Sequence, residues 1–319
     1  MMTTTAASRA ARAGTALHEP PGRAGKPFWR RNHGDLRIAL FFIAPALLGF
    51  VTFYVVPAVR GTYLSFTEYS LLGEPEWVGG ANYAAIAKDP LFWNALAVTG
   101  EYVLINMVLQ TTLALGLALL MHRVARSTLI RGALLLPYLM ANVIAALLWF
   151  WLLDYQIGIV NHFIEALGWP RVAFFGSEAW AIPTQALINT WRHVGYTALL
   201  LFAGLQAIPR QIYEVAELDG ASPIQTLRRI TLPLLRPVIA LVVIVTAIGS
   251  IQIFDTVAVT TQGGPVNASR VLQFYIYQKA FTESDFGYGS ALAVILFVIL
   301  AVVAFVQMKF LRGNESDLD

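Results

Sequence analysis

Ionisable side chains lie inside long apolar stretches of this sequence, where a charge costs free energy and therefore marks a function or a paired structural site. Glu101, Arg192, His193 and Asp255 all occupy such positions. Insertion scales assign a charged group at the centre of a membrane helix a cost of about 2.5–3.5 kcal/mol. Two interpretations stay open: these groups line a polar pathway, or Glu101 and Asp255 snorkel or pair with Arg192. Amides and hydroxyls accompany them: Asn106, Gln110, Asn142, Asn189, Thr246, Ser250 and Gln252.

The polar and aromatic side chains of the later apolar stretches are the candidates for contact with a solute. His193 has no second metal ligand at i+3 or i+4, so a hydrogen-bonded core histidine is favoured over a metal ligand. An intramembrane hydrolase would need a nucleophile beside that histidine, and none is evident. We therefore expect no catalytic residue and no metal site. The candidates are Tyr138, Asn142, Arg192, His193, Tyr196, Thr246, Ser250 and Gln252.

The composition of the 319-residue chain requires a membrane to accommodate these stretches. It is 57% hydrophobic and 13% charged, whereas soluble domains are about 45–50% apolar and about 25% charged. The mean hydropathy of +0.62 agrees. The absence of cysteine excludes disulfides and thiolate chemistry. No basic patch with base-reading residues indicates a nucleic-acid partner.

Six apolar stretches are long enough to cross a bilayer as helices, which requires about 20 residues each. They lack the period-2 alternation of barrel strands. The sequence therefore predicts an all-α integral membrane protein with six transmembrane helices, of which the third is the clearest. The expected spans are Leu36–Val59, Ala95–Met121, Ile130–Leu153, Ala181–Ile208, Leu234–Val259 and Tyr288–Leu311.

The distribution of Lys and Arg predicts the orientation. With a cytoplasmic N-terminus, the inner segments carry 16 of these residues and the outer segments carry five, so both termini are expected in the cytoplasm. Residues 1–35 are expected to be a disordered cytoplasmic tail, and residues 312–319 a second tail. The first apolar stretch exceeds the roughly 7–15 residues of a signal-peptide core, which favours a retained helix.

Two outer loops carry structural signals. Apolar residues at helical spacing between Asp154 and Gly168 predict a short helix on the outer membrane face. Gly263-Gly264-Pro265 predicts a turn that starts an ordered excursion.

The third cytoplasmic connection, at about residues 209–237, predicts two short helices joined at a sharp bend. Gln211 to Leu218 has one apolar side, and Asp219-Gly220 is a helix stop. Ser222-Pro223 then restarts a helix, with Ser222 as N-cap and proline at the first helical position. Helices this short are marginal alone. The pair either docks on a partner or simply links two spans.

This connection resembles the EAA loop of binding-protein-dependent ABC importer permeases. Glu214, Ala216, Gly220, Ile230, Leu232 and Pro233 match the spacing E-x-A-x(3)-G-x(9)-I-x-L-P, and Val215 replaces the usual alanine. Further segments resemble the carbohydrate permeases of the maltose-transporter type, so that the resemblance covers about residues 37–311. These segments are Val78-Gly79 to Asn82-Tyr83, Leu136-Pro137-Tyr138, Asn189-Thr190-Trp191, Gln262-Gly263-Gly264-Pro265 and Phe286-Gly287-Tyr288-Gly289.

The resemblance implies a transmembrane domain over residues 36–311 that imports a sugar or sugar-like solute across a bacterial or archaeal inner membrane. It implies a second permease, two ATPase subunits and an extracytoplasmic binding protein as partners. The connection would be a coupling helix seated in a cleft of the ATPase. The residues implied in coupling are Glu214, Ala216, Asp219, Gly220, Ile230, Leu232 and Pro233.

ATP and Mg²⁺ are then expected on the partner subunits, and this chain is expected to be no enzyme and to hold no cofactor. Its nearest approach to a phosphate loop, Gly22 to Pro27, has two residues between the glycines where four are needed and lacks Ser or Thr after Lys26. The alternative is an ion-coupled secondary transporter that uses Glu101 and Asp255, but it gives no reason for the cytoplasmic helix pair. Aromatic faces for a sugar would come from Tyr138, Trp191 and Tyr196.

Overall fold

The computed structural model describes residues 33–70, 73–123 and 128–312, so the predicted tails lie mostly outside the described residues. The chain forms two units, residues 1–57 and 58–319. α1 (His33–Phe50) and the π-helical turn η2 (Val51–Val55) lie in the first unit, and α2 (Val56–Leu64) begins there and continues into the second. The side chains of Phe41, Phe42 and Phe53 are exposed, which suits a helix that faces lipid.

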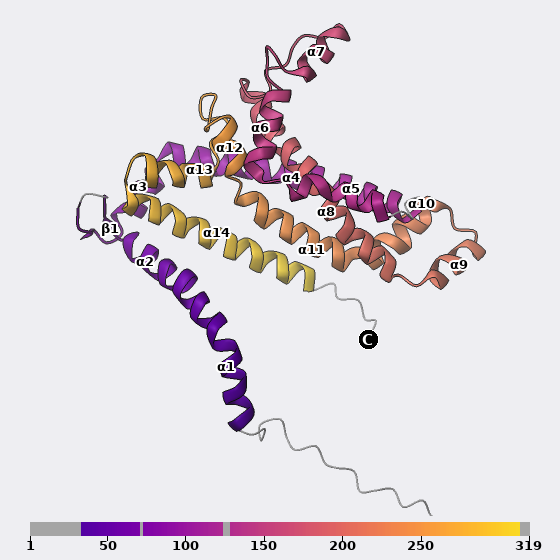
Figure 1. Cartoon of the computed structure of the whole chain (residues 1–319), viewed down its shortest axis with the longest axis horizontal. Helices are drawn as coiled ribbons and strands as arrows, with labels where there is room; N and C mark the ends of the chain where they lie inside the picture. The colour runs from indigo at the N-terminus through magenta and orange to yellow at the C-terminus, as the bar shows by residue number, and fades with distance from the viewer. Residues whose placement is uncertain (1–32, 71–72, 124–127, 313–319) are drawn as a thin grey trace, which may run out of the picture. The chain divides into compact units, whose positions relative to one another are not determined.

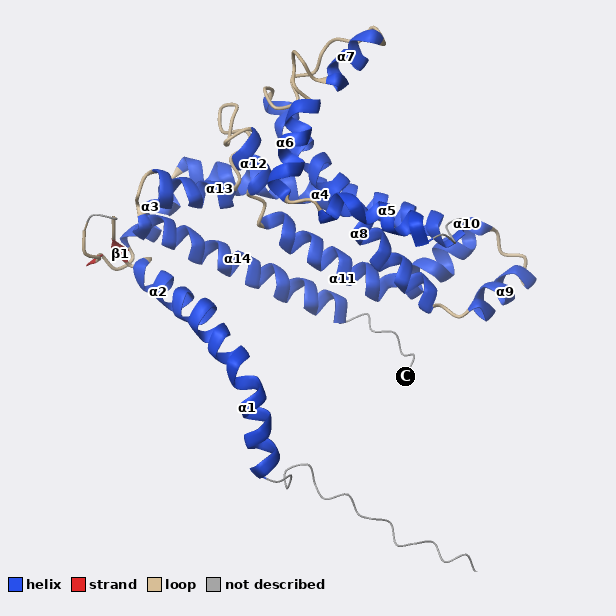
Figure 2. Ribbon diagram, viewed as in Figure 1, coloured by secondary structure: helices blue, strands red, loops and turns tan. Residues whose placement is uncertain are grey.

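Four long helices form the body of the second unit: α4 (Pro90–Arg123), α8 (Glu178–Ala207), α11 (Leu232–Ile251) and α14 (Phe286–Arg312). α4 packs along α8, and α11 contacts α4, α8 and α14 (Figures 1 and 2). Small residues such as Ala114, Ala118 and Ala198 are fully buried where these helices meet. Small side chains let helix backbones approach closely in a membrane. The close packing of these helices therefore depends on the small size of the alanine side chains between them.

The helices α5 (Thr128–Leu139) and α6 (Asn142–Leu152) occupy the third expected span, and that prediction of one clear helix is wrong. The two helices are bent by 91° at a break over Met140 and Ala141. Pro137 lies just before the break, where proline removes a helical N–H and displaces the preceding turn. A second break, at residues 252–254, separates α11 from α12 (Asp255–Thr260).

Within the described residues, four helical segments are long and apolar enough to cross a membrane, or five if the bent pair is one span. The expected number of six is therefore not confirmed. The 30-residue α8 is long enough, but it is not among them because Arg192, His193 and neighbouring polar residues lower its hydropathy. The spans are Leu40–Leu64, Pro90–His122, Pro223–Thr260 and Phe286–Lys309, with the bent pair Leu129–Leu139 and Asn142–Leu152.

Short elements pack against α4 and α14. The antiparallel strands β1 (Thr67–Glu68) and β2 (Glu76–Trp77) pair Thr67 with Trp77. They are followed by α3 (Ala81–Lys88), and α13 (Leu272–Tyr277) continues into the π-helical turn η4 (Gln278–Thr282). α13 packs against α4 and α14.

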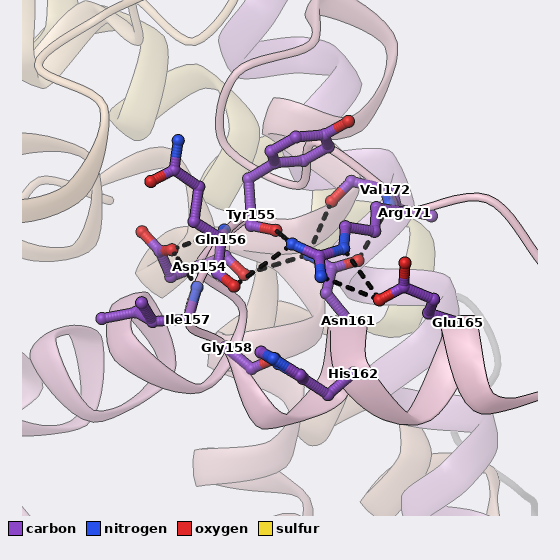
Figure 3. A network of polar contacts seen from close by, with 10 residues as sticks. All are labelled: Asp154, Tyr155, Gln156, Ile157, Gly158, Asn161, His162, Glu165, Arg171 and Val172. Carbon is purple, nitrogen blue, oxygen red and sulfur yellow. Dashed lines mark hydrogen bonds and ion pairs between the residues drawn. The ribbon is translucent and has the colours of Figure 1, made fainter.

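The loop between α6 and α8 contains a short helix, α7 (Ile159–Ala166), within the range that the sequence predicted. The helix starts late because Oδ1 of Asp154 accepts the N–H groups of Gln156 and Ile157 at 2.7 and 2.9 Å. Asn161 donates to the carbonyl oxygens of Asp154 and Val172, both at 3.0 Å. Figure 3 shows this network together with the ion pair that joins Arg171 and Glu165 at 2.8 Å. The loop is therefore ordered by its own polar contacts.

Candidate functional site

A polar cavity of about 280 Å³ lies among α4, α5, α8 and α11 and reaches both helix breaks. Seven of the eight predicted pathway residues line it: Tyr138, Asn142, His193, Tyr196, Thr246, Ser250 and Gln252. Arg192 is not among the lining residues. The cavity wall also includes residues that the sequence analysis did not select as candidates, among them Asn106, Gln110, Asn189, Gly249 and Asp255.

Asn106 is the centre of the hydrogen-bond network in this wall, and it is fully buried. Its Nδ2 donates to Oγ of Ser250 at 2.8 Å and to Oε1 of Gln110 at 3.2 Å. Its Oδ1 accepts from Nδ2 of Asn189 at 3.0 Å and from Oγ1 of Thr190 at 3.2 Å. A buried polar group that bonds on all sides fixes its neighbours. Asn106 therefore sets the positions of polar side chains from α8 and α11.

Aromatic rings form another part of the wall. The rings of Tyr138 on α5 and Tyr196 on α8 stack at 4.5 Å with an angle of 9° between their planes. His193 meets the Tyr138 ring edge-on at 5.6 Å. The cavity thus combines neutral hydrogen-bonding groups with aromatic surface.

Arg192 belongs to the helix break. Its Nε donates to the carbonyl oxygen of Met140 at 2.9 Å, and its Nη2 donates to that of Tyr138 at 3.2 Å. Both carbonyls lie where the helical pattern of α5 ends, so their usual N–H partners are missing. Among the described residues, Arg192 forms no direct ion pair with Glu101 or Asp255, although its charge interacts with that of Asp255. Its guanidinium stabilises the bend.

The contacts of His193 define its tautomer. Nη1 of Arg192 lies 2.9 Å from Nε2 of His193, and Nδ1 of His193 lies 3.0 Å from the carbonyl oxygen of Asn189. Arginine only donates and a carbonyl only accepts. Nε2 therefore accepts and Nδ1 carries the proton, so His193 is a neutral imidazole in this arrangement.

One hydrogen bond joins the two broken helices. Nδ2 of Asn142, the first residue of α6, donates to Oδ2 of Asp255, the first residue of α12, at 2.7 Å. Both residues line the cavity, and α6 packs against α12. The two breaks therefore form one connected wall.

The predicted helix pair after α8 is present, and its first helix, α9 (Arg210–Leu218), is followed by a turn at Asp219 and Gly220. Gly220 has a φ of 71°, a left-handed conformation that glycine adopts at little cost. The N–H groups of Gly220 and Ala221 donate to the carbonyl oxygens of Glu217 and Ala216 at 3.0 and 2.9 Å. This is a Schellman motif, and it makes the corner rigid.

The second helix of the pair, α10 (Pro223–Thr226), begins with a complete capping box. Oγ of Ser222 accepts from the Gln225 N–H at 3.3 Å, and Oε1 of Gln225 accepts from the Ser222 N–H at 2.8 Å. Through the π-helical turn η3 (Leu227–Thr231), α10 continues into α11. The corner is therefore connected directly to a helix that lines the cavity.

The surface of the corner is apolar and exposed. The side chains of Val215, Leu218 and Ile224 are 56%, 87% and 67% exposed. Glu214 and Asp219 are exposed as well, and Ala216 is buried. Ile230 in η3 and Leu232 and Pro233 at the start of α11 are half-buried. Among the described residues, Glu214 has no hydrogen-bond or ion-pair partner.

A helical membrane bundle with a polar cavity between broken helices, and a rigid exposed corner continuous with a cavity helix, defines a membrane transport protein. Residues 110–313 match the family described as the binding-protein-dependent transport system inner membrane component. The chain belongs to this family of ABC importer permeases.

Individual relatives agree with this assignment. The chain is 36% identical to the sulfoquinovosyl glycerol transport system permease protein SmoG of Agrobacterium fabrum, over 91% of this chain and 96% of the relative. It is 29% identical to the trehalose/maltose transport system permease protein MalF of Thermococcus litoralis, over 89% and 97% of the two chains.

The fold is that of a solved permease. The structure of a bacterial alginate ABC transporter in complex with a periplasmic protein carrying an alginate pentasaccharide superposes with a TM-score of 0.79 at 20% identity. The alignment covers 89% of this chain and 97% of the other.

Proposed function

We propose that this permease subunit, together with a second permease, forms the pathway for a sugar or sugar-like solute that an extracytoplasmic binding protein delivers and ATP hydrolysis drives. The sugar transporters among the relatives support the solute class. The alginate transporter, which was solved with a periplasmic protein, suggests the delivering partner. The cavity supplies amides, hydroxyls and stacked tyrosines that suit a polyhydroxylated ring.

The corner at Gly220 carries the proposal of coupling to an ATPase. Val215, Leu218 and Ile224 form a small apolar surface that the chain itself leaves uncovered. Exposed apolar groups on a rigid corner are typical of a protein docking site. Because α10 continues through η3 into α11, a displacement of the corner would be transmitted to Thr246 and Ser250 on the cavity wall.

The orientation and the limits of the domain belong to the same proposal. The membrane domain comprises residues 36–311 with its coupling loop at about 209–237, and the tails 1–35 and 312–319 lie in the cytoplasm with the loop. ATP and Mg²⁺ bind to two partner ATPase subunits. The purified subunit alone should therefore not hydrolyse ATP.

The experiment compares loop and cavity variants in the assembled transporter. Glu214→Ala removes a charge-assisted contact worth roughly 1.5–3 kcal/mol if it is buried against the ATPase. Gly220→Trp adds bulk at a position of positive φ where the chain leaves open space. Both variants should insert normally, lose solute uptake and retain less ATPase on co-purification.

Tyr196→Ala is the matched control for these variants. It removes one ring of the cavity wall and leaves the corner unchanged, so the ATPase should stay bound while uptake falls. Wild-type uptake with full ATPase retention in both Glu214→Ala and Gly220→Trp would refute the coupling role of the loop.

A further inference from the structure

The relatives do not indicate whether the solute of this chain is a charged or an uncharged sugar, and the charge of the cavity wall bears on this question. One relative is a permease for sulfoquinovosyl glycerol, a sulfonated and hence anionic solute, whereas another is a permease for the uncharged disaccharides trehalose and maltose. Similarity to both does not decide whether this chain admits an anion. The groups on the cavity wall bear on that question directly.

The described residues that line the cavity include the carboxylate of Asp255 and neither lysine nor arginine. His193 also lines the cavity, but its contacts with Arg192 and Asn189 make it a neutral imidazole. The remaining polar groups of the wall are uncharged amides and hydroxyls. The formal charge of the wall is therefore negative.

Arg192 is the nearest candidate for a compensating cation, and its guanidinium is already engaged. Nε, Nη1 and Nη2 each donate a hydrogen bond, to the carbonyl oxygen of Met140, to Nε2 of His193 and to the carbonyl oxygen of Tyr138. These three bonds hold the guanidinium against the backbone of the helix break, and Arg192 is not among the residues that line the cavity.

We propose that the cavity admits uncharged polyhydroxylated solutes and rejects anionic ones, and that Asp255 is the residue that sets this selectivity. The proposal rests on the proposed function of the cavity as the solute pathway. Asp255 is held on the wall by the 2.7 Å hydrogen bond from Asn142, so its charge has a defined position. An anionic sugar meets a like charge on a wall whose described residues include no lysine or arginine, whereas a neutral sugar meets the amides and hydroxyls of the wall.

The test measures the electrostatic potential of the cavity with a reporter cysteine, because the chain has no cysteine of its own. Gly249 lines the cavity, and a Cβ at this position meets nothing within 4 Å, so Gly249→Cys introduces a thiol without a clash. The assembled transporter in membrane vesicles is treated with the cationic reagent trimethylammonioethyl methanethiosulfonate and, separately, with its anionic sulfonatoethyl counterpart. Modification is read on this chain by mass spectrometry.

The expected result is that the cationic reagent reacts faster at Gly249→Cys than the anionic one, relative to the same rate ratio at Ser177→Cys on the outer loop. Adding Asp255→Asn should lower the ratio at Gly249→Cys by about threefold or more, since one charge acts in opposite directions on the two reagents. The ratio at Ser177→Cys should not change. sn-Glycerol 3-phosphate, an anionic polyol, serves as a test ligand. If the cavity rejects anions, this compound should not protect the thiol and should not slow the modification of Gly249→Cys.

A faster reaction of the anionic reagent in the chain that retains Asp255, no change in the ratio with Asp255→Asn, or protection by sn-glycerol 3-phosphate would each overturn the selectivity proposal. The labelling ratios require no transport. The labelling ratios can therefore contradict the selectivity proposal while uptake by the Glu214 and Gly220 variants still supports the proposed function. Equally, the uptake measurements can contradict the proposed function while the labelling ratios agree with the selectivity proposal.

Discussion

Arg192 on α8 closes the break between α5 and α6 by donating from Nε to the carbonyl oxygen of Met140 at 2.9 Å. A second bond from Nη2 reaches the carbonyl oxygen of Tyr138. The guanidinium has two structural roles in this position. It replaces the N–H partners that the interrupted helix lacks, and it keeps the Tyr138 ring stacked on Tyr196 at the cavity.

Arg192→Gln should therefore destabilise the assembled transporter and lower solute uptake. The lost charge-assisted hydrogen bonds correspond to roughly 1.5–3 kcal/mol, which thermal unfolding of the purified complex would detect as a lower Tm. Glu165→Gln is the control, because it removes the partly exposed ion pair with Arg171 and leaves the bonds from Arg171 to the carbonyl oxygens of Tyr155 and Gln156 in place. Surface pairs contribute about 0–1 kcal/mol. Equal Tm values for the two variants would contradict the role of Arg192.

Gly195 provides a second test of how α5 is held against α8. A Cβ at Gly195 would lie 1.9 Å from the carbonyl oxygen of Leu134 on α5, so Gly195→Ala requires one helix to move. Overpacking of this kind costs about 1–3 kcal/mol, and uptake should fall because Tyr138 moves with α5. Gly132→Ala, on α5 with nothing within 4 Å of its Cβ, should leave uptake and Tm at or slightly above their wild-type values. Matching Tm values for the two variants would refute the close approach.

The helix stop at Gly220 and the N-cap at Ser222 are predictable from the sequence because the interactions that produce them are local. The Schellman and capping-box hydrogen bonds connect residues at most five positions apart. The break at Met140 is different. Proline inside an apolar run is compatible with a continuous membrane helix, and the guanidinium that stabilises the break lies 52 residues further along the chain.

The cavity illustrates the same distinction. Polar residues in apolar helices identify most of its wall, since a polar group in the membrane needs a polar environment. The central position of Asn106 is not evident from the sequence, because nothing in the sequence distinguishes Asn106 from the other amide residues in the apolar stretches. Its importance arises from partners on α8 and α11, and the 4-residue spacing of Asn106 and Gln110 on α4 is the one local signal.

The proposed orientation predicts which positions react with impermeant thiol reagents in intact cells. Ser177 directly precedes α8 on the side proposed to face outward, and Gln211 is an exposed residue of α9 on the proposed coupling loop. Gln211 is preferable to Ser222, whose hydroxyl caps a helix. Ser177→Cys should react from outside, whereas Gln211→Cys should react only after permeabilisation. Reaction of Gln211→Cys in intact cells would reverse the proposed orientation.

A carboxylate between two tyrosines connects the start of α4 with α13 and α14. Oδ2 of Asp89, between α3 and α4, accepts hydrogen bonds from the hydroxyls of Tyr275 on α13 and Tyr288 on α14. Burial raises the pKa of Asp89, but these bonds, the Leu91 N–H and the charge of Lys279 outweigh it, so that the pKa lies below its usual value of 3.8. The folded protein therefore favours the ionised form.

Because the pKa of Asp89 is lowered on folding, its stabilisation is present above the ordinary pKa and is lost as the pH falls through the lowered value. Asp89→Asn should reduce the Tm of the transporter at pH 7 by the equivalent of about 1 kcal/mol, a modest figure because the site is partly open to solvent. The difference from wild type should shrink as the pH falls below 3.8 and through the lowered pKa of Asp89, where the wild-type carboxyl becomes protonated. Tyr275→Phe, which removes one donor and keeps the ring, should show the same trend with a smaller difference at pH 7. A Tm difference between Asp89→Asn and wild type that stays constant as the pH falls from 7 to well below 3.8 would rule out the ionised carboxylate as the stabilising species.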